Sequence, residues 1–239
     1  MLSGFLYAGH VRFPTKPIGT IPAGAHLAAL NETFAKRLYK CASGTIYQNV
    51  ALLLSETPVI LQALGVEPLP LVIRDKTVEK VLRGKHRLLL SILRSIPAEL
   101  HDPIAVFDST TEPGNFVVMT GLKNGRGKTI IVAVHPSREY GRHKLNMVAS
   151  VYEKERDAWF AKQTEKGALR YVNIKKASVW SVTSGQLFLS RVRGTSQGSG
   201  SNILTYDDFV KEKRGVPDTL FHSPQAGEDE NTLPGPAPG

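Results

Sequence analysis

The sequence contains a single cysteine, Cys41, among 239 residues. One thiol cannot close an intrachain disulfide, and it cannot supply the paired thiolates of a structural zinc site. We therefore expect neither a disulfide framework nor a cysteine-based metal centre, and we interpret Cys41 as a small, largely apolar residue in or near the core.

Long apolar stretches are also missing. No run approaches the roughly 20 apolar residues that a membrane-spanning helix requires, and the opening segment MLSGFLYAGHVRF lacks the charged and continuously apolar regions of a secretory signal. These absences predict a protein without a membrane partner, located in the cytoplasm.

The familiar sequence signatures of enzymes are absent too. The chain has no GxGxxG, GxxxxGK[ST], HExxH or GxSxG motif. The stretch GLKNGRGKT (121–129) has the glycine and lysine content of a phosphate loop without its spacing, so we interpret it as a hairpin turn. His135 and His143 are eight residues apart, which does not favour a metal site. We expect no metal and no cofactor.

Acidic residues are in the minority. Lysine and arginine total 30 against 21 acidic residues, which gives a net charge of +9 and a pI near 9.7. Three acids cluster in the segment GEDEN near the C-terminus, so the remainder is more basic still. A basic balance favours a polyanionic partner such as RNA, DNA or an anionic membrane surface.

Hydrophobic periodicity predicts an α+β fold with a mainly antiparallel sheet and helices on one side. We expect a helix at 25–40, two helices within 45–64, and helices at 76–84, 87–102 and 153–167. We expect strands at 68–75, 104–109, 116–122, 128–136, 145–152 and 169–176. The chain divides into an N-terminal arm with helical segments (1–66), a domain (67–211) and a flexible acidic, Pro/Gly-rich tail (212–239).

The segment VLRGKHRLLL contains the first candidate site. His86 follows Gly84 and is flanked by Lys85 and Arg87. An imidazole can both take and give a proton near neutral pH, and neighbouring cations can hold a phosphate. The alternative is that these are the solvated cations of a helix C-terminus, where they interact with the helix dipole.

Two predicted strands supply further polar candidates. Alternation within 146–154 would place Asn146, Ser150 and Tyr152 on one face, with Lys154 just beyond. In RYVNIKK, Tyr171 and Lys175 share a face in the same manner. A solvated sheet surface is the alternative. Together with a histidine, however, such a face could cleave RNA without metal, by attack of the 2′-hydroxyl on the adjacent phosphorus.

The motif series GKHRL, DPIAVFDS, LNMVASVYEK and LRYVNIKKAS resembles the C-terminal domain of phage MuF-type proteins. Those domains are predicted members of the barnase–EndoU–colicin–RelE (BECR) nuclease fold. The resemblance covers about residues 67–176 and extends toward 211. It implies a helical start, a curved antiparallel sheet of four to five strands, and a toxin-like, metal-independent endoribonuclease with its active site on the sheet face.

The resemblance also implies roles for individual residues. It places the catalytic residues at His86, Ser150 and Tyr152, and the family's Asp-Pro pair at Asp102 and Pro103. Its substrate-binding residues are Lys85, Arg87, Asn146, Lys154, Tyr171 and Lys175. The partners it implies are RNA, host RNA or tRNA among them, and a cognate immunity or host protein. The chain would act in the cytoplasm or be carried in a phage particle.

Other functions stay open. A non-catalytic phage protein could use the same basic surface to bind nucleic acid or to inhibit a host or defence protein. A structural virion protein would account for the long N-terminal arm. An ADP-ribosyltransferase is disfavoured, because the sequence has neither an Arg–Ser-Thr-Ser–Glu set nor a convincing Glu-x-Glu. The sequence does not predict an oligomeric state.

Overall fold

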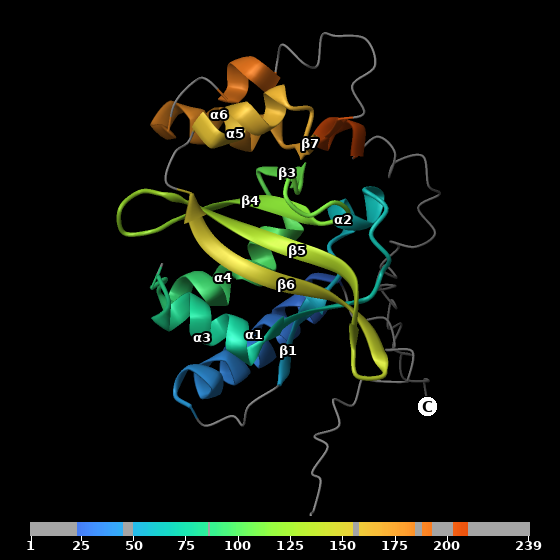
Figure 1. Cartoon of the computed structure of the whole chain (residues 1–239), viewed down its shortest axis with the longest axis vertical. Helices are drawn as coiled ribbons and strands as arrows, with labels where there is room; N and C mark the ends of the chain where they lie inside the picture. Colours follow the sequence, from blue (N-terminus) through green and yellow to red (C-terminus); the bar gives the residue numbers. More distant parts are fainter. Residues whose placement is uncertain are drawn as a thin grey trace, which may run out of the picture.

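The computed structural model describes residues 23–44, 50–85, 87–154, 158–184, 188–192 and 203–209. The predicted tail (212–239) lies outside these residues. The described residues build one eight-stranded sheet with helices against both of its faces (Figure 1). The helices are α1 (Ala23–Ala42), α2 (Val59–Ala63), α3 (Asp75–Arg83), α4 (Leu90–His101), α5 (Ala158–Glu165) and α6 (Ile174–Ser184). The strands are β1 (Ala51–Glu56), β2 (Pro70–Arg74), β3 (Ala105–Asp108), β4 (Phe116–Lys123), β5 (Thr129–Tyr140), β6 (His143–Lys154), β7 (Leu169–Val172) and β8 (Leu204–Thr205).

The strand order is β1-β2-β6-β5-β4-β3-β7-β8. The β2–β6 and β7–β8 pairs are parallel, and the other five pairs are antiparallel. The predicted α+β class and mainly antiparallel sheet are therefore confirmed. The predicted size of four to five strands is wrong, because all six strands expected from the sequence join one sheet and β1 and β8 form its two edges.

The prediction of a helix across 45–57 is wrong, because residues Ala51–Glu56 form strand β1. Leu52 and Leu54 are fully buried on one side of the strand, and Ala51 is buried on the other. A strand buried on both faces lacks the apolar–polar alternation that identifies a strand, so its apolar run could equally be read as helix.

β7 corrects the prediction of a strand across 169–176. The strand ends at Val172, and Asn173 begins helix α6. The Asn173 side-chain oxygen accepts a hydrogen bond from the backbone N–H of Lys176 at 3.1 Å. This contact is an N-cap, for which asparagine is among the preferred residues, and it turns the chain out of the sheet.

Helices cover both faces of the sheet, which corrects the prediction of one covered side. On the first face, α1, α3 and α4 pack with Val132 and Val148 in the largest core. On the second face, α5 and α6 pack with Phe107 and Ile131. Figure 1 shows α5 and α6 beside β3 and β4, at the opposite end of the molecule from α1 and α3.

Elements on the N-terminal side of residue 67 share the first-face core. Phe34 and Leu38 of α1 are 1 % exposed and pack with Leu52 and Leu54 of β1. Residues 23–66 therefore contribute to the same hydrophobic core as the later strands wherever the structure describes them. Among the described residues, no helix is both long enough and apolar enough to cross a membrane.

Candidate functional site

One part of the second face is not covered by a helix within the described ranges. Its apolar cluster consists of strand residues alone, with Val72 and Leu145 buried and Leu53, Tyr140 and Met147 partly exposed. Toward β5, the same face carries five partly exposed residues. They are Ala133 and His135 on β5 and Met147, Ser150 and Tyr152 on β6. We call these five residues the open sheet face.

A β-bulge in β6 determines which residues reach this face. Ala133 pairs with Ser150 but Val134 pairs with Val148, so Ala149 is an extra residue in β6. A bulge of this kind shifts the alternation of side chains by one position. Val148 consequently lies in the first-face core, whereas Tyr152 packs against the second-face core.

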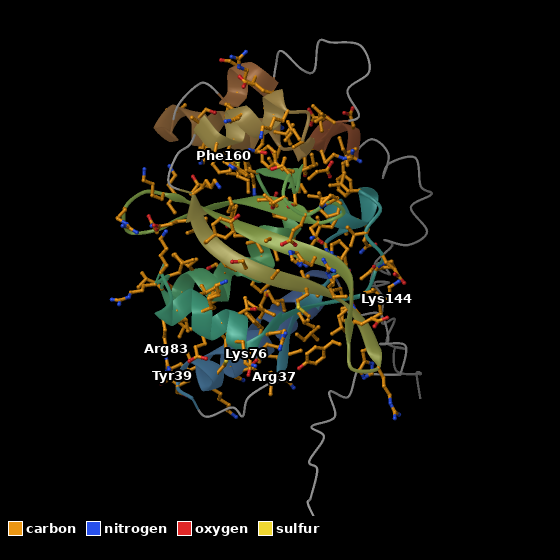
Figure 2. The ribbon with its side chains drawn as sticks, viewed as in Figure 1. Arg37, Tyr39, Lys76, Arg83, Lys144 and Phe160 are labelled. Carbon is orange, nitrogen blue, oxygen red and sulfur yellow. The ribbon has the colours of Figure 1, made fainter. Side chains whose placement is uncertain are left out.

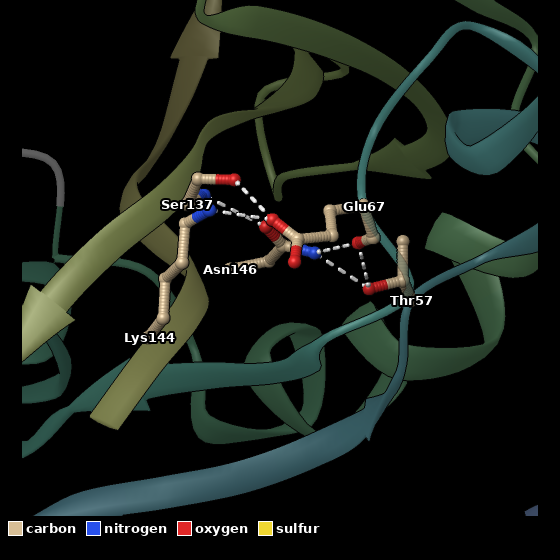
Figure 3. Close-up of polar contacts among 5 residues, drawn as sticks. All are labelled: Thr57, Glu67, Ser137, Lys144 and Asn146. Atoms are coloured by element: carbon tan, nitrogen blue, oxygen red, sulfur yellow. Dashed lines mark hydrogen bonds and ion pairs between the residues drawn. The ribbon is translucent and has the colours of Figure 1, made fainter.

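The bulge separates Asn146 from Ser150 and Tyr152, so the prediction that the three share one face is wrong. Asn146 is fully buried (0 % exposed). Its amide nitrogen donates to Thr57 Oγ1 at 2.7 Å and to the Glu67 carbonyl oxygen at 2.8 Å (Figure 3). Its oxygen accepts from the backbone N–H of Ser137 at 2.9 Å. Asn146 therefore joins three irregular segments of backbone and presents no surface to a substrate.

An exposed ion pair lies at the protein surface near the buried Asn146 amide. Lys144 Nζ lies 2.7 Å from Glu67 Oε2, and Ser137 Oγ donates to the same oxygen at 3.3 Å (Figure 3). The hydrogen bond from Lys144 lowers the pKa of the Glu67 carboxyl below its ordinary value. Glu67 thus joins the loop before β2 to both β5 and β6.

Ser150, Tyr152 and Lys154 follow one another at every second position of β6, with the first two on the open sheet face. Burial raises the pKa of the Tyr152 phenol, which keeps it protonated at neutral pH. The ammonium of Lys154 lies 4.2 Å from the centroid of the Trp159 ring and 5.8 Å from that of Tyr152. These cation–π contacts hold a positive charge at the end of the row.

The corner between α3 and α4 lies on the other side of the sheet. His86 is outside the described residues, while Lys85 and Arg87 are exposed. The backbone N–H of Leu88 donates to the Val81 carbonyl at 3.0 Å, and both side chains belong to the first-face core. The packing of Val81 and Leu88 on either side of this corner therefore gives no support to a cleft shared by His86, Ser150 and Tyr152. The role of His86 stays a prediction.

The two remaining predicted site residues, Tyr171 and Lys175, also lie apart from Ser150 and Tyr152. Tyr171 is fully buried in the first-face core, and burial, with a smaller effect of Asp102, raises the pKa of its phenol. Lys175 lies exposed on α6 rather than on a strand, because Asn173 has begun the helix. Neither residue joins the open sheet face.

A polar cluster around His135 was not predicted from the sequence. Glu112 Oε2 lies 3.2 Å from His135 Nε2 and accepts a hydrogen bond from Asn115 Nδ2 at 2.9 Å. Arg138 Nη2 donates to Asn115 Oδ1 at 3.1 Å and lies 3.5 Å from His135 Nδ1. Alternation in 128–136 could have separated His135 from the buried valines of β5, but no local pattern shows that Glu112 and Asn115 approach it.

Residues 77–179 match the family model of the phage MuF C-terminal domain. This segment is therefore similar to the C-terminal domain of phage MuF. It begins in α3, ends in α6 and contains the whole His135 cluster together with Ser150, Tyr152 and Lys154. No curated protein and no solved structure matches the chain.

The match agrees with the MuF part of the resemblance seen in the sequence. The assignment to BECR nucleases is a further step, which the match does not include. The MuF-like segment excludes α1, β1 and β2, although all three contribute to the first-face core. Among the described residues, no three His, Cys, Asp or Glu side chains gather as a metal site.

Proposed function

We propose that this chain is a metal-independent endoribonuclease that cleaves RNA on the open sheet face. The observation that carries the proposal is the row of Ser150, Tyr152 and Lys154 on a partly exposed part of the sheet. The MuF-like segment and the net charge of +9 support it, since a basic protein attracts a polyanion.

The chemistry requires groups that stabilise a doubly charged phosphorane. A lysine ammonium attracts this charge, and a protonated phenol can donate a hydrogen bond to a phosphate oxygen. The Ser150 hydroxyl, next in the row, can donate or accept a hydrogen bond to the ribose or phosphate. The row thus offers donors to the phosphates of a bound RNA, and the proton acceptor must come from another side chain of the open sheet face.

We expect Tyr152→Phe combined with Lys154→Gln to lower the rate of RNA cleavage by about 10²-fold or more, because two donors to the phosphates of the bound RNA are removed. The assay uses a fluorogenic RNA in the presence of EDTA. Lys162→Gln is the charge-matched control, since Lys162 is exposed on α5 and is not part of the open sheet face as defined above. Equal rates for the double variant and the control would contradict a reaction on this face.

A second candidate, nucleic-acid binding without catalysis, is favoured by a row of cations on α3. Lys76, Lys80 and Arg83 lie at i, i+4 and i+7 along the solvent side of the helix, and Lys85 and Arg87 follow at the corner. Figure 2 labels Lys76 and Arg83 on this outer surface. A Glu79 oxygen lies 3.6 Å from Arg83, which is an exposed pair of small energetic effect.

If α3 binds the phosphate backbone, replacing Lys76, Lys80 and Arg83 with glutamine should weaken single-stranded RNA binding uniformly across sequences. The slope of log affinity against log salt should become shallower by about 2, at about 0.7 per lost phosphate contact. Fluorescence anisotropy at several salt concentrations measures both quantities. The control removes three other exposed cations, Lys162, Lys166 and Arg142. A slope equal to that of the control would contradict binding through α3.

A further inference from the structure

We propose that His135 is the general base of this reaction, with Glu112 orienting its ring and Arg138 binding the scissile phosphate. The inference rests on the proposed function of the open sheet face and adds a proton acceptor to it. His135, Glu112, Asn115 and Arg138 make up the cluster, and all four lie inside the MuF-like segment.

The hydrogen-bond partners of His135 determine its tautomer. Glu112 Oε2 lies 3.2 Å from Nε2, and a carboxylate can only accept, so Nε2 carries the proton. Arg138 Nη2 lies 3.5 Å from Nδ1, and a guanidinium can only donate, so Nδ1 carries the lone pair. Both partners therefore specify the same tautomer, with Nδ1 free to accept a proton once a phosphate draws Arg138 toward itself.

Asn115 keeps this arrangement in place. It is 4 % exposed, donates to Glu112 at 2.9 Å and accepts from Arg138 at 3.1 Å. The carboxylate and the guanidinium are thus held on either side of the imidazole by one buried amide. Orientation of a histidine by a carboxylate is also the arrangement that activates the base in serine hydrolases.

The strand register places His135 beside the proposed reaction site. Ala133 pairs with Ser150, and His135 lies two residues further along β5 on the same face. Two residues along a strand span about 7 Å, and the bulge at Ala149 lies on β6 between Ser150 and the partner of His135. A ribose and its phosphate can bridge that gap. The side chain of His135 is 23 % exposed, so a substrate can reach it.

The environment keeps the imidazole neutral. Burial lowers the pKa of His135 below its ordinary value, Glu112 opposes the shift, and Arg138 adds to it. Among the described residues, the charged groups that act on the ring are these two, one from the loop before β4 and one from its own strand. From β6, the residue paired with His135 is Met147, which does not titrate. A base that is unprotonated at neutral pH is ready to accept a proton.

The chemical step follows from these positions. His135 Nδ1 removes the proton from a ribose 2′-hydroxyl, whose oxygen forms a bond to the adjacent phosphorus held by Arg138. The bond from phosphorus to the 5′-oxygen breaks, and that oxygen takes a proton from water. The products are a 2′,3′-cyclic phosphate and a 5′-hydroxyl, and solvent hydroxide returns the imidazolium to its neutral form.

The test compares His135→Gln, Glu112→Gln and the control His143→Gln in the full chain, with cleavage of the same RNA measured across pH. The glutamine at 135 can still donate to Glu112 but cannot take a proton, so we expect a loss of 10²–10⁴-fold at an unchanged melting temperature. Glu112→Gln removes the charge that raises the pKa of His135, so the rising limb of its pH profile should move to lower pH. His143 is exposed in the β5–β6 hairpin, and its variant should match the wild type.

The outcomes separate the two proposals. Wild-type protein that leaves RNA intact overturns the proposed function and, with it, the role of His135. Active wild type with an equally active His135→Gln variant and an unchanged pH profile overturns the role of His135 alone. If His135→Gln also lowers the melting temperature, its loss of activity could reflect unfolding. In that case, cleavage by His135→Ala is measured with and without added imidazole. Restored cleavage supports the general base, and no restoration overturns it.

Discussion

Replacing Asn146 with leucine is expected to lower the free energy of unfolding by about 3 kcal/mol. Leucine has the same number of side-chain heavy atoms but forms no hydrogen bonds. The Ser137 N–H and Thr57 Oγ1 therefore lose their bonds to the amide, and the Glu67 carbonyl, which still accepts from the Leu69 N–H at 2.8 Å, loses one of its donors. A buried polar group left without a hydrogen bond costs about 1–3 kcal/mol. Urea denaturation followed by circular dichroism measures the change.

Thr57→Val is the graded comparison for Asn146→Leu. Thr57 Oγ1 accepts from Asn146 at 2.7 Å and donates to the Leu69 carbonyl, and valine keeps its shape without these bonds. We expect a smaller loss, about 1 kcal/mol. If Asn146→Leu costs no more than Thr57→Val, the buried amide does not hold the three backbone segments together.

Phe160→Ala is expected to lower the free energy of unfolding by about 3–5 kcal/mol. Phe160 is fully buried, and its ring lies edge-on to Trp159 at 5.2 Å and to Trp180 at 5.4 Å between centroids. Figure 2 labels it where α5 meets the sheet. The alanine leaves a cavity at the centre of the second-face core, which the rigid neighbouring rings cannot fill.

Val182→Ala is the matched control for Phe160→Ala. It lies on α6 in the same layer but is 85 % exposed, so its removal should change the free energy of unfolding by no more than about 0.5 kcal/mol. Equal losses for the two variants would mean that α5 and α6 do not pack on the sheet around Phe160. Differential scanning calorimetry gives both values.

The sequence predicts β2 to β6 and the start of β7, and it indicates a short strand and a helix within 203–215, where the structure has β8. Only β1 was misread. β3, β4, β5 and β6 have runs of apolar and β-branched residues separated by turn signals, and the expected ranges agree with the structure. β1 was predicted as helix because burial on both faces removes its alternation. The short β8 has two residues and pairs with β7 alone, so no local pattern could identify its partner.

The candidate site could also be predicted from the sequence only in part. Alternation placed Ser150 and Tyr152 together, and the structure agrees. The extra residue Ala149 moved Asn146 to the opposite face, and a bulge depends on pairing with β5 that one strand does not reveal. His135 was recognised only as an isolated histidine, because its partner Glu112 comes from a loop more than 20 residues earlier.

The most direct test of the account is analysis of RNA ends after incubation with the full chain in excess chelator. We predict fragments that carry 2′,3′-cyclic phosphate and 5′-hydroxyl ends, formed by the wild type and strongly reduced in Tyr152→Phe/Lys154→Gln. RNA that stays intact at micromolar protein, or fragments that carry 3′-hydroxyl ends, would contradict cleavage by 2′-hydroxyl attack on the open sheet face.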